Sequence, residues 1–239
     1  MKTWVLSVGG SIIAPEGADS KFIAGFYSLI KSYIEKDNRF IIVTGGGAVA
    51  RDYQNALRKI ISITGSSHTD EGDQSAELDW IGIAATRLNA RLMKAVFHEY
   101  CREEVVTDPT VPTNFAGSVL VAAGWKPGFS TDYDAVILAE SFGADTVINL
   151  SNIKQVYSAD PKQDPEAVPL DSLTWEDFRE LSGGDWTPGK NSPFDPVAAG
   201  KAADSGLKVI VADGRDLENL RAIFAGKPYT GTLIGSDPD

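Results

Sequence analysis

Two glycine-rich turns near the start of the chain could bind phosphate. The first is Gly-Gly-Ser at residues 9–11, after the apolar residues 5–8, and the second is Gly-Gly-Gly at residues 45–47, after the apolar residues 40–43. A strand that ends in glycines and then starts a helix directs unpaired backbone N–H groups, with the positive end of the helix dipole behind them, at one point in space. Two such turns indicate two phosphate groups held face to face, as phosphoryl transfer requires.

The residues that follow these turns add candidates for anion binding. Arg51 stands one helical turn beyond the second turn, where its guanidinium could donate a fork of hydrogen bonds to the same anion. A third glycine-bearing segment, residues 124–132, carries Ser130 and Thr131 directly before a predicted helix. One residue there would cap the helix, and the two hydroxyls could bind a base or a phosphate.

Several acidic and aromatic residues have two interpretations each. Asp79 stands at the predicted start of a long helix, where it would either cap the helix or bind a ribose. Asp132 and Asp134 fall in the first turn of a later helix, where they could place a magnesium ion or only pair with the helix dipole. Tyr157 would pack against an adenine or cover the core. The functional interpretations together predict a nucleotide site.

The second turn also fits a rival pattern. Residues 45–50 match the dinucleotide fingerprint G-x-G-x-x-A. A dinucleotide-binding fold needs a second strand soon afterwards that ends in an acid for the ribose. This chain instead has a polar stretch at residues 62–75, predicted to be an exposed loop, and then the long helix. The context therefore favours a phosphate turn over a redox cofactor, with a turn used only for packing as the remaining alternative.

Short apolar runs alternate with helical patterns along the chain. Strands are predicted at residues 5–8, 40–43, 119–123, 146–150, 207–212 and 232–234, and helices at residues 22–33, 53–60, 78–96, 135–142 and 217–224. This alternation predicts an α/β fold with a mainly parallel sheet covered on both faces. Ligands of such sheets bind at the carboxyl ends of the strands, where both turns fall. Residues 158–193 hold five of the twelve prolines and are predicted to be the least regular part.

The composition is that of a globular protein with 239 residues, which can form one large domain or two small lobes. The formal net charge of −11 makes nucleic acid and anionic membrane unexpected partners. Cys101 is the one cysteine, so the chain has no internal disulfide, and we expect a packed thiol there rather than a nucleophile. No leader pattern opens the chain and no apolar run is long enough to span a membrane, so we expect a cytoplasmic protein.

The motifs, in this order, resemble the amino acid kinase superfamily and, within it, the archaeal type of uridylate (UMP) kinase. The similarity covers nearly the whole chain. The motifs that carry it are Val8-Gly9-Gly10-Ser11, Gly45-Gly46-Gly47 with Ala50-Arg51, Asp79-Trp80-Ile81-Gly82-Ile83 with Thr86-Arg87 and Asn89-Ala90, Pro127-Gly128 with Ser130-Thr131-Asp132, Leu138-Ala139-Glu140, Val156-Tyr157 with Ala159-Asp160-Pro161, Asp195-Pro196 with Ala198-Ala199, Ser205-Gly206-Leu207-Lys208, Asp213-Gly214-Arg215 and Gly231-Thr232.

This resemblance implies a three-layer α/β/α sandwich that transfers the γ-phosphoryl group of ATP to UMP with Mg²⁺, usually in a hexamer. It divides the single domain 1–239 into an acceptor-binding lobe, about residues 1–145, and an ATP-binding lobe, about residues 146–239. Carried over by position, the ATP-binding residues would be Gly9, Gly10, Ser11, Gly47, Arg51, Ser151, Asn152, Tyr157 and Asp160. The UMP-binding residues would be Gly46, Asp79, Gly124, Pro127, Gly128, Ser130 and Thr131, and the catalytic residues Arg51, Asp132, Lys190 and Lys201.

Three positions depart from the family pattern. Many superfamily members carry a lysine where Ser7 stands. The family motif Asn-Val-Asp-Gly-Val-Tyr is Asn-Ile-Lys-Gln-Val-Tyr at residues 152–157, which changes the charge and the turn geometry beside the nucleotide. Gly200 replaces the lysine of Asp-Pro-x-Ala-Ala-Lys and Lys201 follows it, a shift that rotates a helical side chain by about 100°. Lys190 could supply the missing cation.

Two alternatives to a UMP kinase follow from these departures. One keeps the fold and changes the acceptor to another small phosphate or carboxylate. The other is a non-catalytic assembly that binds nucleotides or anions. The sequence also leaves open whether the protein is a hexamer or a dimer.

Overall fold

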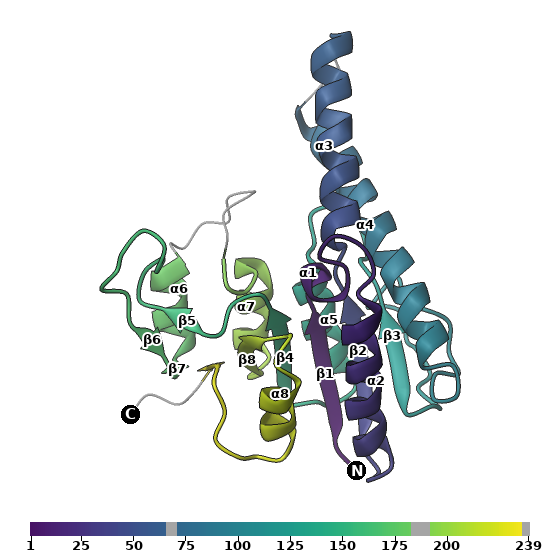
Figure 1. The fold of residues 1–239 in the computed structure, drawn as a ribbon, viewed down its shortest axis with the longest axis vertical. Helices are drawn as coiled ribbons and strands as arrows, with labels where there is room; N and C mark the ends of the chain where they lie inside the picture. Colours follow the sequence, from purple (N-terminus) through teal and green to yellow (C-terminus); the bar gives the residue numbers. More distant parts are fainter. Residues whose placement is uncertain (66–70, 183–191, 236–239) are drawn as a thin grey trace.

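The computed structural model describes residues 1–65, 71–182 and 192–235. A seven-stranded sheet crosses the molecule in the order β3-β2-β1-β4-β8-β9-β7 (Figure 1). The strands are β1 (Thr3–Val8), β2 (Arg39–Thr44), β3 (Val119–Ala122), β4 (Thr146–Ser151), β7 (Ser172–Leu173), β8 (Lys208–Asp213) and β9 (Thr232–Ile234). All neighbouring strands are parallel except the antiparallel pair β8 and β9. The predicted mainly parallel sheet is confirmed.

Helices cover both faces of this sheet, as the alternating pattern predicts. They are α1 (Gly10–Ile13), α2 (Ser20–Ile34), α3 (Gly47–Thr64), α4 (Glu71–Val96), α5 (Thr131–Ser141), α6 (Trp175–Ser182), α7 (Pro196–Asp204) and α8 (Leu217–Phe224). Leu6 and Ile42 point into the core formed with α2, α4 and α8, whereas Val5 and Ile41 point into the core formed with α5, α6 and α7. Both faces of each central strand are therefore buried, which gives the continuous apolar runs in the sequence and three layers.

The second and third predicted helices are longer than expected. Helix α3 continues to Thr64 and α4 already begins at Glu71, so the loop predicted at residues 62–75 is wrong outside the undescribed residues 66–70. Helix α3 extends beyond the ends of the strands (Figure 1). Its apolar residues Tyr53, Ile60 and Ile63 are 67%, 54% and 83% exposed. The spacing of Tyr53 and Ile60 predicts the helix correctly, but these side chains do not face the core.

Short strands lie in, and just before, residues 158–193, the part predicted to be least regular. Strands β5 (Val156–Tyr157) and β6 (Pro169–Leu170) form a small antiparallel pair outside the main sheet. Two-residue strands are too short to show a periodic pattern, which is why the sequence does not predict them.

Cys101 is buried as predicted, and burial raises the pKa of its thiol. None of the described helices is long and apolar enough to cross a membrane.

Candidate functional site

The two glycine turns lie in backbone contact at the carboxyl ends of β1 and β2. The Gly9 N–H donates to the carbonyl of Leu150, and the Gly45 N–H donates to the carbonyl of Val8, both at 2.9 Å. A Cβ atom on Gly10 would lie 1.9 Å from the backbone nitrogen of Gly47. Position 10 therefore has no room for any side chain, and the absence of one lets the two turns meet.

Several backbone N–H groups at the starts of α1 and α3 have no hydrogen-bond partner among the described residues. Gly10 and Ser11 begin α1, and Gly47, at φ +71°, begins α3 after Gly46. The N–H groups of these four residues donate to no carbonyl of the described residues, as the first N–H groups of helices have no partner within the helix. Converging unpaired N–H groups at a helix start form an anion-binding concavity. The predicted phosphate turns therefore carry unpaired N–H donors at the starts of α1 and α3.

Helix α4 holds the second turn in place through a buried amide. The Asn89 Nδ2 group donates to the carbonyl of Gly45 at 2.8 Å and to the carbonyl of Gly46 at 3.2 Å. Sequence analysis places Asn89 in a family motif without a role. The sequence signal for such an anchor is a polar residue on a helix face that is otherwise apolar. Thr86 and Asn89 are residues of this kind, and both are buried.

The same helix also holds residues 124–128 of the third glycine-bearing segment. The Thr86 hydroxyl accepts a hydrogen bond from the Gly124 N–H at 2.8 Å, and Asp79 Oδ2 accepts one from the Gly128 N–H at 2.9 Å. Asp79 lies well inside α4, so its prediction as a helix-start residue is wrong. The sequence suggested that error because the first two turns of α4 are polar. The structure does bring Asp79 together with the segment predicted to bind the same ligand.

The start of α5 uses its polar residues to fix the backbone. Ser130 is the helix cap, because its Oγ accepts a hydrogen bond from the Tyr133 N–H at 3.2 Å. Asp132 accepts a hydrogen bond from the Ser7 hydroxyl at 2.7 Å and a longer one from the Asp195 N–H at 3.4 Å. Removal from water raises the pKa of Asp132 to about 6. Ser7 stands where many superfamily members carry lysine, so Asp132 has a neutral partner at that position.

Asp134 is a buried carboxyl in the first turn of α5. Its side chain is buried, its Oδ2 accepts from the Trp125 N–H at 3.2 Å, and its Oδ1 has no hydrogen-bond partner. Burial raises the pKa of Asp134 to about 7. Within the described residues no group of three His, Cys, Asp or Glu side chains could hold a metal ion. The interpretation of Asp134 as a magnesium-placing residue stays a prediction.

This buried carboxyl makes stability depend on pH. Because the folded state raises the pKa of Asp134 from 3.8 to about 7, the folded protein keeps a proton that the unfolded chain releases. Stability contributed by this group therefore falls as pH rises from about 4 to about 7, by on the order of 4 kcal/mol. In urea unfolding, Asp134→Asn is expected to gain stability relative to wild type between about pH 4 and about pH 7. A pH-independent difference between the two proteins would contradict this.

The predicted cations occupy different places. Arg51 is exposed on α3, with its Nη2 3.5 Å from the carbonyl of Pro15. Lys201 Nζ lies 2.8 Å from Glu140 Oε2, and this hydrogen bond raises the pKa of Lys201. Glu140 follows Asp132 by eight residues on α5, about 12 Å along the helix. The ion pair thus holds Lys201 toward the far end of α5, and Lys190 lies outside the described residues.

The residues predicted for the adenosine side follow β4. Ser151 Oγ accepts a hydrogen bond from the Ile153 N–H, and the Asp160 carboxylate accepts from the Lys162 N–H at 2.9 Å, so both stabilise turns. Asn152 is exposed and Tyr157 is half-buried. The substituted residue Gln155, which the sequence suggested only as a disruption, donates to Asp171 at 2.9 Å and to the Gly231 carbonyl at 3.2 Å. It therefore connects this loop to the entrance of β9.

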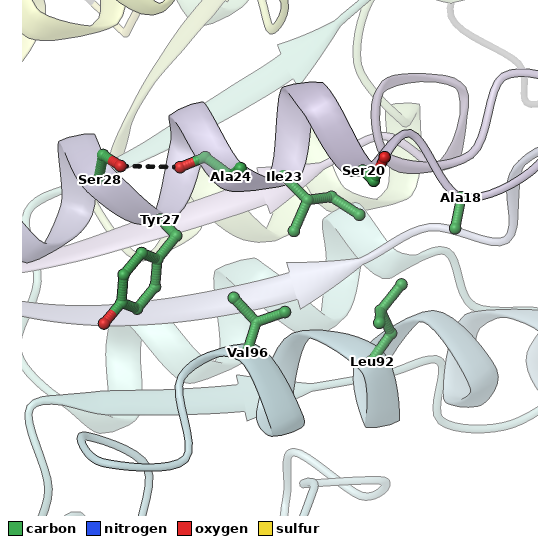
Figure 2. A pocket seen from close by; sticks show the side chains of 8 residues that line it. All are labelled: Ala18, Ser20, Ile23, Ala24, Tyr27, Ser28, Leu92 and Val96. Atoms are coloured by element: carbon green, nitrogen blue, oxygen red, sulfur yellow. Dashed lines mark hydrogen bonds between the residues drawn. The ribbon is translucent and has the colours of Figure 1, made fainter.

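A separate apolar groove of about 440 Å³ lies between α2 and α4 (Figure 2). Ile23 and Tyr27 of α2 face Leu92 and Val96 of α4 across it. None of the residues predicted for the nucleotide site lines this groove. The candidate site is instead the region where the two glycine turns meet, together with the segment held by α4.

Known proteins match this chain over its whole length. It is 36% identical to a uridylate kinase of Methanoculleus marisnigri, with 100% of this chain and 99% of the relative covered, and 35% identical to a uridylate kinase of Methanospirillum hungatei, with 98% and 95% covered. A solved uridylate kinase from Archaeoglobus fulgidus superimposes with a TM-score of 0.79 at 35% identity, covering 98% of this chain and 100% of that one. The model of the amino acid kinase family matches residues 2–213. This protein belongs to the amino acid kinase family.

Proposed function

We propose that this protein transfers the γ-phosphoryl group of ATP to UMP. The observation that carries the proposal is the backbone contact between the two glycine turns, which gathers four unpaired N–H groups where transferred and accepting phosphates would meet. Phosphoryl transfer needs alignment and charge neutralisation more than covalent help from the protein. The choice of UMP is supported by the relatives named uridylate kinase and by the anchoring of residues 124–128 to Asp79.

The family resemblance supports the following roles for the residues. Gly9, Gly10, Ser11, Gly47 and Arg51 bind the ATP phosphates, and Ser151, Asn152, Tyr157 and Asp160 bind the adenosine. Gly46, Asp79, Gly124, Pro127, Gly128, Ser130 and Thr131 bind UMP. Asp132, between the ATP-binding and the UMP-binding residues, accepts hydrogen bonds from the Ser7 hydroxyl and the Asp195 N–H and holds both in place. Residues 1–145 form the acceptor lobe and residues 146–239 the ATP lobe.

Magnesium enters this scheme as part of the MgATP substrate. Mg²⁺ keeps several waters and binds substrate phosphates in preference to a cage made of protein. This fits the described residues, which hold no cluster of metal-binding side chains. We further propose that the enzyme serves pyrimidine nucleotide synthesis in the cytoplasm as a homo-oligomer, a hexamer or a dimer.

A coupled ADP-release assay with ATP, Mg²⁺ and a panel of monophosphates tests the proposal. UMP is expected to be the best acceptor. Turnover with CMP or a non-nucleotide but not with UMP would keep the fold and replace the acceptor. Measurable ATP binding without turnover of any acceptor would favour a non-catalytic assembly, the alternative that the pairing of Lys201 with Glu140 supports. Thermal stabilisation by NAD and not by ATP would restore the redox-cofactor interpretation.

Replacing Lys201 by methionine is expected to change kcat by less than about threefold. Its ammonium is engaged by Glu140, and a partly exposed ion pair contributes at most about 1 kcal/mol to stability. Steady-state kinetics with ATP and UMP measure the effect, with Glu140→Gln as the matched control for loss of the ion pair. A fall in kcat of about 100-fold for Lys201→Met alone would instead assign Lys201 the catalytic role that the family resemblance implies.

A further inference from the structure

Charged side chains hold the backbone on both sides of Trp125. Its N–H, in the peptide group shared with Gly124, donates to Asp134 Oδ2 at 3.2 Å, and its carbonyl, in the next peptide group, accepts a hydrogen bond from Arg87 Nη2 at 3.1 Å. Asp134 comes from α5 and Arg87 from α4, so the two helices that border residues 124–129, the acceptor segment, each fix one of these peptide groups.

Neither charged group is fully satisfied by this arrangement. Asp134 Oδ1 and Arg87 Nε are both buried and have no hydrogen-bond partner. Asp134 also stands near two other acids, Asp132 and Asp108, whose charges add to the effect of burial in raising its pKa. A buried carboxyl with an unpaired oxygen and acidic neighbours is costly to the folded state. An apolar residue there would remove the cost of the unpaired oxygen but would leave the Trp125 N–H without its acceptor.

The hydrogen bond from the Trp125 N–H ties Asp134 to the acceptor segment. The Trp125 ring packs on Phe129 with ring centres 5.0 Å apart, and Phe129 packs on Tyr133 at 4.7 Å. Lys126 Nζ lies 3.8 Å from the centre of the Trp125 ring. A rotation of the backbone at Trp125 would therefore move an aromatic row and an exposed cation together. The hydrogen bonds from the Gly124 and Gly128 N–H groups to α4 do not involve the Trp125 N–H or carbonyl.

We propose that Asp134 is a positioning residue for the acceptor: through the Trp125 N–H, and opposite Arg87, it holds residues 124–129 in the conformation that binds the monophosphate. The proposal rests on the proposed function, because it assigns this segment to UMP. It predicts that Asp134 acts on acceptor affinity and leaves the ATP side unchanged. An oxygen acceptor at this position is what the role requires, and a negative charge is not.

The test compares Asp134→Val, which removes the acceptor, with Asp134→Asn, which keeps one. Asp134→Val is expected to raise the KM for UMP about tenfold, with kcat and the KM for ATP within about twofold of wild type. Asp134→Asn is expected to restore the KM for UMP to within about twofold of wild type. A purely structural role would change the unfolding midpoint of Asp134→Val without changing the KM for UMP, and that result would overturn the proposal.

A second variant loosens the next peptide group, on the other side of Trp125. Arg87→Met is expected to raise the KM for UMP as well, and the double variant to lose little more than the more impaired single variant, because both act through the backbone at Trp125. Fully multiplicative losses would contradict a shared mechanism. The affinity for UMP, measured by calorimetry, separates the two proposals: binding without turnover overturns only the proposed function, and its weakening in Asp134→Val still supports the positioning role. If the wild-type protein neither binds nor phosphorylates UMP, both proposals fail.

Discussion

Gly10→Ala is expected to lower kcat/KM by at least about 10²-fold, since even a displacement near 1 Å in a phosphoryl-transfer site has an effect of that size. The added methyl group would lie 1.9 Å from the backbone nitrogen of Gly47 and 2.7 Å from the carbonyl carbon of Gly46. Backbone atoms cannot swing aside as the end of a long side chain can, so the two turns must separate. Steady-state kinetics and ATP binding by calorimetry measure the loss.

The matched control for this prediction is Gly17→Ala. Gly17 lies in the exposed loop after α1, and a Cβ there would meet no heavy atom within 4 Å. Its kinetics and its unfolding midpoint are expected to match those of the wild type. A Gly10→Ala protein that keeps wild-type kcat/KM would show that the contact between the turns is not needed for catalysis, and the observation that carries the proposed function would be lost.

Asp79→Ala is expected to raise the KM for UMP by about 10- to 100-fold, the loss typical of a hydrogen bond to a charged group. Asp79 accepts the Gly128 N–H and so holds one end of the acceptor segment, in addition to its proposed contact with the UMP ribose. The KM for ATP is expected to stay unchanged, because the glycine turns are held by other groups. Initial-rate kinetics that vary each substrate separately measure both constants.

Glu77→Ala provides the control on the same helix. Glu77 is exposed and lies two residues before Asp79, so its loss removes the same charge without touching residues 124–128. Equal effects of the two substitutions would indicate a general electrostatic influence of α4 and would remove Asp79 from the acceptor site. A rise in the KM for ATP with Asp79→Ala would contradict the separation of the two substrate sides.

The two predictions share one physical basis. The first concerns a glycine that lets two backbone turns touch, and the second a carboxylate that ties a third segment to the same region. Helix α4 connects them, because Asn89 fixes the second turn while Thr86 and Asp79 fix the third segment. A single rigid helix thus sets the distance between the phosphate turns and the acceptor segment. Rigid placement of this kind is the main contribution that protein makes to phosphoryl transfer.

The long helices show where local pattern and tertiary structure diverge. The spacing of Tyr53 and Ile60 predicts helix α3, and the helix is there, but these side chains are exposed. Periodicity reports that apolar residues share a face, not which surface covers that face. The polar first turns of α4 carry little apolar periodicity, so the sequence predicts a loop where the helix has already begun.

The sequence by itself determined the strands of three or more residues, the glycine turns and the family, because each depends on residues that are adjacent in the chain or on their order along it. Only the tertiary structure decided that a Cβ on Gly10 would collide with Gly47, that Asp79 serves Gly128, and that Lys201 pairs with Glu140. Except for Gly10 and Gly47, the partners in these contacts lie about 50 or more residues apart. Such partners are chosen by how helices pack on the sheet, and local sequence pattern does not record that choice.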